Sequence, residues 1–212
     1  MSVWAIVVAA GAGARFGAPK QYEMLGDRRV VDWALAGARA VADGVVLVVA
    51  PERAGAPELG ADAVVAGATT RSGSVRAGLA AVPGEAEVVV VHDAARPLAA
   101  PTLFEAVIAA VRAGADGAVP GVAIADTVKR VDGEAVQATL DRAGLVAVQT
   151  PQAFSAAALR QAHEGALDAS DDAALVEAGG GRVVVVPGDP RNAKITTPLD
   201  LTIARVVVSR ET

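Results

Sequence analysis

A glycine-rich turn near the start of the chain has the residues of an anion-binding loop. Gly11 and Gly13 directly follow an apolar run, and Arg15 and Lys20 come shortly after them. Glycine allows positive φ and the close approach of a ligand, so successive backbone N–H groups can converge on a phosphate while the two cations add charge. The spacing excludes a Walker loop, which needs Gly-Lys-Ser/Thr, and the dinucleotide fingerprint, which needs glycine where this chain has Phe16. The turn therefore predicts phosphate binding, and the alternative is an ordinary strand-to-helix turn in an alanine-rich chain.

A carboxylate follows a second apolar run. Asp93 comes directly after His92, and Arg96 and Pro97 follow it. A carboxylate opposite a phosphate loop is well placed to hold a divalent cation that bridges phosphates, and the alternative is a turn or helix-capping aspartate. Arg96 can bind an anion or pair with Asp93, and we favour the anion because Pro97 stiffens the loop that presents the guanidinium.

Two further loops carry residue types that contact nucleotides. In residues 67–75 the small and hydroxylated side chains let a flat base approach the backbone, with Ser74 or Thr69 as hydrogen-bonding groups and Ser72 as a helix cap. Near the end of the chain, Lys194 lies in a loop from which it either reaches the phosphates or is solvated.

Other candidates are interpreted as structural. Asp171 and Asp172 follow Ser170 at a helix start, where acidic side chains interact favourably with the helix dipole. His163 lies among polar neighbours and is expected to face solvent. The chain has no cysteine, which excludes disulfides, zinc–thiolate sites and cysteine nucleophiles. It also has no Gly-x-Ser-x-Gly, the turn that presents a hydrolase serine.

The elements that position these residues alternate between strands and helices. Apolar strands separated by helices indicate a parallel sheet covered on both faces, in which ligands bind at the carboxyl ends of the strands. The predicted fold class is therefore α/β, with right-handed crossovers. Asp27, Ser72 and Thr102 are the predicted caps of the first three helices. The predicted strands are Val3–Ala10, Val45–Ala50, Ala63–Ala66, Glu87–His92 and Gly117–Val122, and the predicted helices are Val30–Val41, Ser72–Ala81 and Thr102–Val111.

Residues 123–150 interrupt this alternation and predict an inserted arm. Asp126–Val131 and Val136–Leu140 are half-polar and β-like, and the Asp132-Gly133 pair between them is typical of a tight hairpin. A two-stranded arm is barely stable alone, so we expect it to pack on a second subunit. After the arm, the sequence predicts helices from Ser155 and Ser170, a strand over Arg182–Pro187 and a helix from Pro198.

Length and composition limit the classes of function. The 212 residues fit one domain, 1–212. Hydrophobic content is 53%, but Gly, Pro or a charge interrupts every apolar run before it is long enough to span a membrane, and no Lys or Arg precedes the first run as in a secretory signal. A net charge of −5 and 3% aromatic residues argue against a nucleic-acid surface. We expect a cytoplasmic protein that binds neither membrane nor nucleic acid.

The motifs resemble those of the 2-C-methyl-D-erythritol 4-phosphate cytidylyltransferase family, in order, from about residue 3 to residue 205. The glycine turn alone is shared by many sugar nucleotidyltransferases. The Val-His-Asp-Ala-Ala-Arg-Pro segment, together with the Asp-Thr of the arm and Thr-Pro-Gln, is far more specific. The segments that carry the resemblance are Ala9–Tyr22, His92–Pro97, Asp126–Arg130, Asp141-Arg142, Thr150–Gln152 and Asn192–Thr196.

This resemblance implies a Rossmann-like, mostly parallel α/β sheet with helices on both faces and an inserted β-arm used in dimerisation. It implies transfer of CMP from CTP to the 4-phosphate of methylerythritol, with release of diphosphate, in non-mevalonate isoprenoid synthesis. The cofactor would be Mg²⁺ or another divalent cation. Because the substrate phosphate is itself the nucleophile, no Ser, Cys or His nucleophile is needed, and the reaction depends on alignment and charge stabilisation.

Family roles carry over to the matching positions of this chain. Arg15, Lys20 and Lys194 match residues that stabilise charge on the reacting phosphates, and Asp93 matches the aspartate that binds magnesium. Thr127 and Arg142 match arm residues that reach the methylerythritol phosphate of the other subunit. The positions that match the nucleotide site are Ala9, Ala10, Gly11, Gly13, Ala68, Thr69, Ser74 and Ala94, and those that match substrate contacts are Asp93, Arg96, Thr127, Arg142 and Thr150.

The chain departs from the family pattern in its loops. Phe16 stands where methionine or leucine is usual and is expected to be accommodated by packing. The segment from Arg15 to Lys20 is shorter than in many members, and Ala68-Thr69-Thr70 stands where glycine and an acidic or polar residue are common. Two other functions stay open on the sequence: transfer to another polyol phosphate such as ribitol 5-phosphate, and nucleotide binding without turnover.

Overall fold

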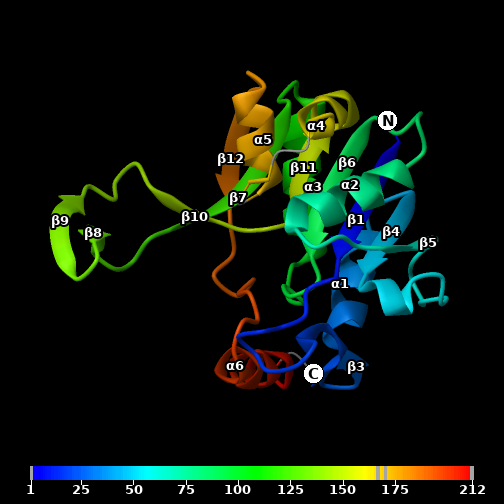
Figure 1. Cartoon of the computed structure of the whole chain (residues 1–212), viewed down its shortest axis with the longest axis horizontal. Helices are drawn as coiled ribbons and strands as arrows, with labels where there is room; N and C mark the ends of the chain where they lie inside the picture. Colours follow the sequence, from blue (N-terminus) through cyan, green and yellow to red (C-terminus); the bar gives the residue numbers. More distant parts are fainter. Residues whose placement is uncertain (1, 166–167, 170, 211–212) are drawn as a thin grey trace.

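A mostly parallel sheet forms the centre of the molecule (Figure 1). The structure is a computed structural model that describes residues 2–165, 168–169 and 171–210. Its eight-stranded sheet has the order β10-β7-β11-β6-β1-β4-β5, and β12 pairs with β7. The strands are β1 (Val3–Val8), β4 (Gly44–Val49), β5 (Ala63–Ala66), β6 (Val88–Asp93), β7 (Gly117–Ala123), β10 (Val146–Val148), β11 (Gln152–Ser155) and β12 (Val183–Pro187).

The inner strands are runs of β-branched residues. β4 and β6 are dominated by valine and are buried at every position, which suits strands that have helices on both sides. β1 pairs in parallel with both of them, and β4 pairs in parallel with β5. The predicted α/β class is confirmed, and each of the five predicted strands agrees with the observed bounds to within two residues.

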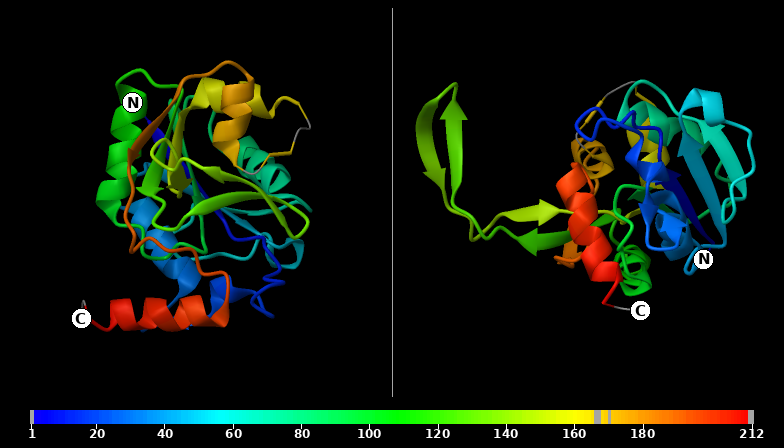
Figure 2. Two further views of the ribbon diagram at one scale, coloured as in Figure 1. Left: turned by 90° about the vertical axis from the view of Figure 1, so that its left-hand side faces the viewer. Right: turned by 90° about the horizontal axis from the view of Figure 1, so that it is seen from below.

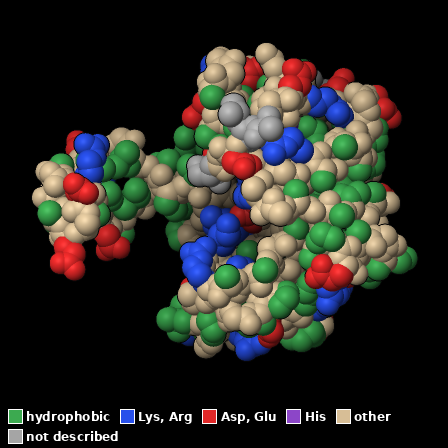
Figure 3. All heavy atoms as spheres, viewed as in Figure 1, with side chains coloured by type: hydrophobic (Ala, Val, Ile, Leu, Met, Phe, Trp, Pro, Cys, Tyr) green, Lys and Arg blue, Asp and Glu red, His purple; other side chains and the backbone are tan. Residues whose placement is uncertain are grey.

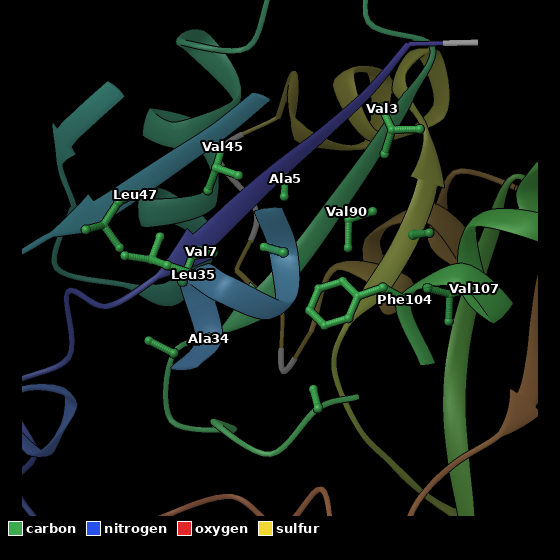
Figure 4. Close-up of a cluster of buried hydrophobic side chains, with 14 of the residues drawn as sticks. Val3, Ala5, Val7, Ala34, Leu35, Val45, Leu47, Val90, Phe104 and Val107 are labelled. Carbon is green, nitrogen blue, oxygen red and sulfur yellow. The ribbon is translucent and has the colours of Figure 1, made fainter. Parts of the chain in front are cut away.

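Helices cover both faces of the sheet because alternate residues of each strand point in opposite directions. Ala5 and Val7 of β1 pack in a cluster with residues of α1 (Val30–Arg39) and α3 (Pro101–Arg112), including the buried Phe104 (Figure 4). Ile6 packs in the opposite cluster. That cluster includes residues of α2 (Arg71–Ala80), α4 (Ala156–His163) and α5 (Asp172–Ala178). The sheet is thus fixed between two apolar layers, and this also fixes the points at which loops leave its edges.

One strand of the sheet has no signal in the sequence. β11 is antiparallel to β6 on one side and to β7 on the other. Its four residues mix polar and apolar types, so only the tertiary pairing with two neighbours defines it. β11 brings the Thr-Pro-Gln segment alongside the end of β6, next to Asp93.

The last helix packs on a short hairpin outside the main sheet. α6 (Pro198–Val208) begins at the predicted proline and buries Leu201 against Leu25, which lies in the hairpin of β2 (Met24–Leu25) and β3 (Arg28–Arg29). Phe16 packs against the same cluster, as expected for a packing residue. None of the described helices is both long and apolar enough to cross a membrane.

The predicted caps of α1 and α3 are wrong for local reasons. Asp27 lies in the turn between β2 and β3, and α1 begins three residues later, at Val30, with Arg29 as its N-cap. α3 begins at Pro101, one residue before the predicted cap Thr102. Proline suits the first helical position because its fixed φ matches the helix, and the residue before it, Ala100, is the N-cap without a side-chain hydrogen bond.

The predicted arm is a hairpin that stands apart from the sheet (Figures 1 and 2). β8 (Val128–Asp132) pairs with β9 (Ala135–Leu140), and Gly133 in the connecting turn has a φ of +56°. Val131 and Val136 face each other across the hairpin and are 58% and 60% exposed. The arm therefore leaves apolar side chains uncovered.

Candidate active site

Three loops meet at the carboxyl edge of the parallel strands. The register pairs Val8, at the end of β1, with Asp93, at the end of β6, and it pairs Val49 of β4 with Ala66 of β5. The loops that follow β1, β5 and β6 therefore start at the same edge of the sheet, the edge where such sheets bind ligands. They line a cavity of about 440 Å³. Its lining residues are Val8, Ala9, Ala10, Gly11, Ala12, Lys20, Gln21, Ala68, Thr69, Thr70, Arg71, Ser74, Asp93, Ala94, Ala95 and Lys194.

The cavity includes most of the residues that were predicted for the nucleotide and phosphates. Gln21, Thr70 and Arg71 line it as well, although the sequence predicted no individual contact for any of them. On the face shown in Figure 3, Lys and Arg side chains gather around a hollow near the segment between β12 and α6. The predicted site residues that do not line the cavity are Gly13, Arg15, Arg96, Thr127, Arg142 and Thr150.

The two glycines of the first turn have different roles. Gly13 has a φ of +71°, and a Cβ there would overlap the carbonyl oxygen of Ala18, so the turn requires glycine at this position. Gly11 does not have a positive φ, contrary to expectation. Open space lies beside its Cα, which is the property that a closely approaching ligand needs.

The position of Lys20 is fixed by the side chain of the next residue, Gln21. Gln21, buried on the short helix η1 (Lys20–Tyr22), donates hydrogen bonds from Nε2 to the carbonyl oxygens of Ala9 at 2.8 Å and Gly11 at 3.1 Å. This bond pair fastens η1 to the beginning of the turn. Burial, together with the charges of Lys194 and Arg15, lowers the pKa of the Lys20 ammonium. Arg15 is exposed and lies outside the cavity lining, but its charge acts on Lys20.

The carboxylate of Asp93 is held between two cations. Lys194 donates from Nζ to Oδ2 at 2.6 Å, and Arg71 donates from Nε to Oδ1 at 3.2 Å. Burial alone would raise the pKa of Asp93, but the charges of Arg71 and Lys194 outweigh burial and hold it well below its usual range. Asp93 is therefore not a helix cap, and Lys194 is not simply solvated. Arg71 was missed because an arginine at the first position of a helix has no distinctive pattern.

Arg96 does not pair with Asp93. Its guanidinium donates to the backbone carbonyls of Asn192 at 2.8 Å and Val148 at 3.4 Å. Burial lowers its pKa. Arg96 thus joins the loop before β11 to the loop that contains Lys194, and anion binding by its remaining N–H groups stays a prediction.

A buried hydrogen-bond chain fixes the loop around Asp93. The carbonyl oxygen of Arg96 can only accept, so His92 Nε2, 3.1 Å away, must carry the proton. The Nδ1 atom of the neutral ring then accepts from the hydroxyl of Thr150 at 3.1 Å, and that hydroxyl accepts from the backbone N–H of Asp93 at 3.0 Å. Burial lowers the pKa of His92 to about 4, which favours this neutral ring. Thr150, predicted to contact substrate, is buried here and holds Asp93.

Ser74 shapes the wall of the cavity that faces the predicted base. Its hydroxyl accepts from the backbone N–H of Ala68 at 3.1 Å and is 2.9 Å from the carbonyl oxygen of Thr70, to which it donates. Gly67 lies against Ala10 so closely that a Cβ would overlap it. The loop after β5 therefore lies directly on the loop after β1, and Ser74 holds it there.

Thr70 caps α2, so the prediction of Ser72 as the cap is wrong. Thr70 has the extended backbone of an N-cap, and its Oγ1 accepts from the N–H of Gly73 at 3.0 Å. The same hydroxyl donates to Asp168 at 2.8 Å. Ser72 accepts from the N–H of Ala169 at 3.3 Å and thereby holds a different segment.

The two acidic residues at the start of α5 have separate roles. Ser170, which precedes them, lies outside the described residues. Asp171 caps α5 by accepting from the N–H of Ala174 at 3.1 Å, which agrees with the structural interpretation. Asp172 is completely buried and pairs with Arg71 at 2.8 Å and with His163 at 3.0 Å. The prediction that His163 faces solvent is wrong because α4 packs against α5 and encloses the ring.

The arm residues lie away from the cavity of their own chain (Figure 1). Thr127 is exposed. Arg142 is exposed as well and donates to the carbonyl oxygens of Ile124 and Ala125 at the base of the arm. The structure therefore brings the phosphate-site residues together and leaves Thr127 and Arg142 outside.

The fold and the cavity define a class of protein. A parallel α/β sheet with a glycine turn, two lysines and a buried carboxylate at its carboxyl edge can align phosphates and stabilise charge on them. Walls made of alanine and small hydroxyl residues leave room for a nucleotide. These are the features of a nucleotidyltransferase.

Comparisons with known proteins give the family. The model of the 2-C-methyl-D-erythritol 4-phosphate cytidylyltransferase family matches residues 3–210, so the chain belongs to this family. It is 44% identical to the cytidylyltransferase of Nocardia farcinica, with 99% of this chain and 95% of that protein covered. The crystal structure of the Thermus thermophilus enzyme superposes with a TM-score of 0.86 at 36% identity, covering 99% of this chain and 100% of that one.

A bifunctional enzyme IspD/IspF of Clavibacter michiganensis is also similar, with 47% identity over 97% of this chain. The chain spans 54% of that relative's length, so it corresponds to about half of the bifunctional protein. Family membership makes the chain a cytidylyltransferase, and the reaction of the family is CTP-dependent synthesis of 4-diphosphocytidyl-2-C-methyl-D-erythritol in the isoprenoid pathway. The Rossmann-like α/β fold expected from the motifs is confirmed by these relatives.

Proposed function

We propose that this chain transfers CMP from CTP to the 4-phosphate of 2-C-methyl-D-erythritol in the cavity at the carboxyl edge of the sheet. The observation that carries the proposal is the convergence of Lys20, Lys194 and Asp93 on one cavity from three distant parts of the sequence. An oxygen of the methylerythritol phosphate attacks the α-phosphorus of CTP. The bond from that phosphorus to the bridging oxygen breaks, and diphosphate leaves with the electron pair.

The basic residues stabilise the charge that moves in this step. Lys20 and Lys194 face the cavity, and Arg15 lies near enough to influence Lys20. Charge on the α-phosphate and on the leaving diphosphate grows as the bond breaks, so fixed cations act more strongly in the transition state than in the ground state. The hydrogen bonds of Gln21 fasten the short helix η1 to the start of the glycine turn, so the side chain of Lys20 is held beside the cavity.

The nucleotide binds in the cavity against the loops after β1 and β5. Backbone groups of Ala9, Ala10 and Gly11 receive the phosphates and ribose, with Gly13 shaping the turn. The base lies against the second loop and contacts its backbone, because the Ser74 hydroxyl is already used within the loop. The residues of this second loop that line the cavity are Ala68, Thr69 and Ser74, and Ala94 adds to the lining from the loop after β6.

Asp93 is the candidate magnesium ligand. Among the described residues, no group of three or more His, Cys, Asp or Glu side chains is arranged to hold a metal. The site nevertheless fits Mg²⁺, which is commonly bound by one or two carboxylates together with substrate phosphates and water. Each oxygen of Asp93 accepts one bond from a cation and keeps a further lone pair. When bound, the ion neutralises charge on the phosphates.

The methylerythritol phosphate site is shared between two chains in this proposal. The arm at about residues 123–150, an insertion in a single nucleotidyltransferase domain, packs on a second copy and brings Thr127 and Arg142 to that copy's cavity. Arg96 completes the substrate side, and Thr150 acts there by holding Asp93. Support comes from the arm itself, which carries its polar residues away from its own cavity and exposes apolar side chains.

A diphosphate-release assay with each nucleotide and each polyol phosphate in turn tests the proposal. We expect turnover with CTP and methylerythritol phosphate, and little with other pairs. Turnover only with ribitol 5-phosphate would overturn the substrate assignment. Tight CTP binding without any diphosphate release would favour a binding protein.

A further inference from the structure

A buried chain of charged and polar side chains runs from Asp93 into the interior of the molecule. Arg71 donates from Nε to Asp93 at 3.2 Å and from one terminal nitrogen to Oδ2 of Asp172 at 2.8 Å. Oδ1 of Asp172 lies 3.0 Å from Nε2 of His163. The side chains of Asp172 and His163 are 0% and 2% exposed, so neither contacts a ligand in the cavity.

We propose that Asp172 and His163 are positioning residues for the transfer reaction. They hold the guanidinium of Arg71 so that it bonds Asp93 through Nε alone, and they thereby set the orientation and the effective charge of the Asp93 carboxylate. This inference rests on the proposed function, in which Asp93 binds magnesium beside the phosphates of CTP.

The division of Arg71 between two carboxylates is the physical basis of the inference. Arginine beside a single carboxylate commonly forms two parallel N–H···O bonds with it. Here Asp172 accepts from Nη1 and holds the guanidinium so that Asp93 receives a single bond, from Nε, while the buried Nη2 is left without a hydrogen-bond partner among the described residues. Because Lys194 already occupies the other oxygen, a fully engaged Arg71 would leave Asp93 neutralised on both sides. Asp172 therefore keeps negative charge available at Asp93 for a cation.

His163 fixes Asp172 in the orientation that Arg71 needs. A carboxylate only accepts, so the ring donates from Nε2 to Oδ1 while Oδ2 stays turned toward Arg71. The ring comes from α4 and the carboxylate from α5, and the two helices pack against each other. The pair also contributes to this packing, so the experiment must separate positioning from stability.

The change Asp172→Asn removes the charge and keeps the shape, and Asp171→Asn is its matched control. Asp171 lies at the same helix start but caps α5 and bonds Gln152, without any contact to Arg71. The main readout is calorimetric binding of CTP without acceptor substrate, once with magnesium and once with EDTA. Asp172→Asn should lose most of the gain in CTP affinity that magnesium gives and keep the affinity in EDTA. Its kcat should fall about tenfold or more, as for groups that orient metal ligands.

Asp171→Asn should keep both the magnesium-dependent gain and kcat. A folded Asp172→Asn protein that matches this control would overturn the inference. Asp93→Asn in the same titration distinguishes a failure of the proposed role of Asp93 from a failure of the positioning role of Asp172. If Asp93→Asn keeps the magnesium-dependent gain, the proposed role of Asp93 is wrong. If it loses the gain while Asp172→Asn keeps it, only the positioning role is wrong.

A second pair of variants decides the question if Asp172→Asn does not fold. His163→Gln retains an N–H donor toward Asp172, whereas His163→Leu does not. We expect the Gln variant to keep most of the magnesium-dependent gain in CTP affinity and the Leu variant to lose it, with both unfolding midpoints recorded. Equal behaviour of the two variants in the titration would contradict a positioning role for His163.

Discussion

The nucleotide edge and the arm are two polar regions of one chain that are held in opposite ways. At the edge, Asp93 ends a completely buried strand, and each of its oxygens accepts a hydrogen bond from a cation. In the arm, Arg142 bonds only backbone at the arm's own base, and the paired Val131 and Val136 are more than half exposed. This chain alone therefore orders the residues proposed to bind phosphate, whereas the arm leaves both its polar and its apolar side chains uncovered.

The largest expected effect is at the edge. Lys20→Ala should lower kcat by about 10²-fold or more, a loss of about 3 kcal/mol, because the ammonium acts on charge that develops in the transition state. CTP affinity should change much less. Lys129→Ala is the control, since this lysine lies in the arm and donates to Thr139. Near-normal turnover of the Lys20 variant at saturating substrates would show that the ammonium does not act in the reaction.

The buried scaffold beneath Asp93 should make stability depend on pH. His92 has a pKa of about 4 in the folded chain against an ordinary value of 6.5, so between these values only the unfolded chain takes up the proton. The free energy of unfolding should therefore fall by about 3 kcal/mol as the pH drops from about 6.5 to about 4, and this contribution is fully present above 6.5. Denaturant titrations with EDTA at several pH values measure it. His92→Gln should have a clearly flatter profile, and an equal slope in both proteins would exclude His92 as the source.

The arm should act on the substrate of another chain. Arg142→Ala removes a charge-assisted contact to the methylerythritol phosphate, so the KM for that substrate should rise roughly tenfold or more while CTP binds normally. Mixing Arg142→Ala with Lys20→Ala, and allowing subunits to exchange, should restore activity at one site per heterodimer. That site has Lys20 from one chain and Arg142 from the other. A mixture that contains heterodimers and stays as inactive as its parents would contradict the shared site.

The smallest expected effect is on the stability of the arm's own chain. Changing Val131 and Val136 together to serine should alter the free energy of unfolding of a monomer by less than about 0.5 kcal/mol per site, because both side chains are exposed. The same change should weaken self-association, which sedimentation at decreasing protein concentration would detect. Unchanged association would mean that these valines lie outside the interface between subunits.

The sequence predicts the strands and loops of the nucleotide edge well, because local pattern and tertiary structure agree there. Runs of valine identify β4 and β6, and the glycine turn and Asp93 follow strands whose carboxyl ends must lie together in a parallel sheet. β11 was not predictable, because its residues have no periodicity and pairing from both sides defines it. The arm was predicted from its half-polar strands and tight turn, and its hairpin is confirmed.

The side chains that support the site were the hardest to predict. Arg71, Asp172 and His163 are far apart in the sequence and look like a helix-start arginine, a helix-start acid and a surface histidine. Only the packing of α2, α4 and α5 on one face of the sheet reveals that Arg71 and Asp172 form a buried ion pair, to which His163 is hydrogen-bonded. Hydrophobic periodicity shows which face of a helix is apolar, but it does not show which polar side chains make buried contacts.

The bonds of Gln21 have a consequence for the length of the glycine turn. Because Gln21 reaches back to the carbonyl oxygens of Ala9 and Gly11, the residues between Gly11 and Lys20 form a ring that is closed at its base. Lys20 stands on the closed side of this ring, so its position is independent of the number of residues at the far side. Lengthening such a loop costs only about 0.6 kcal/mol per doubling in chain entropy. The exposed side of the turn, around Ala14 and Gly17, is therefore the place where the chain can accept insertions while Lys20 stays at the cavity.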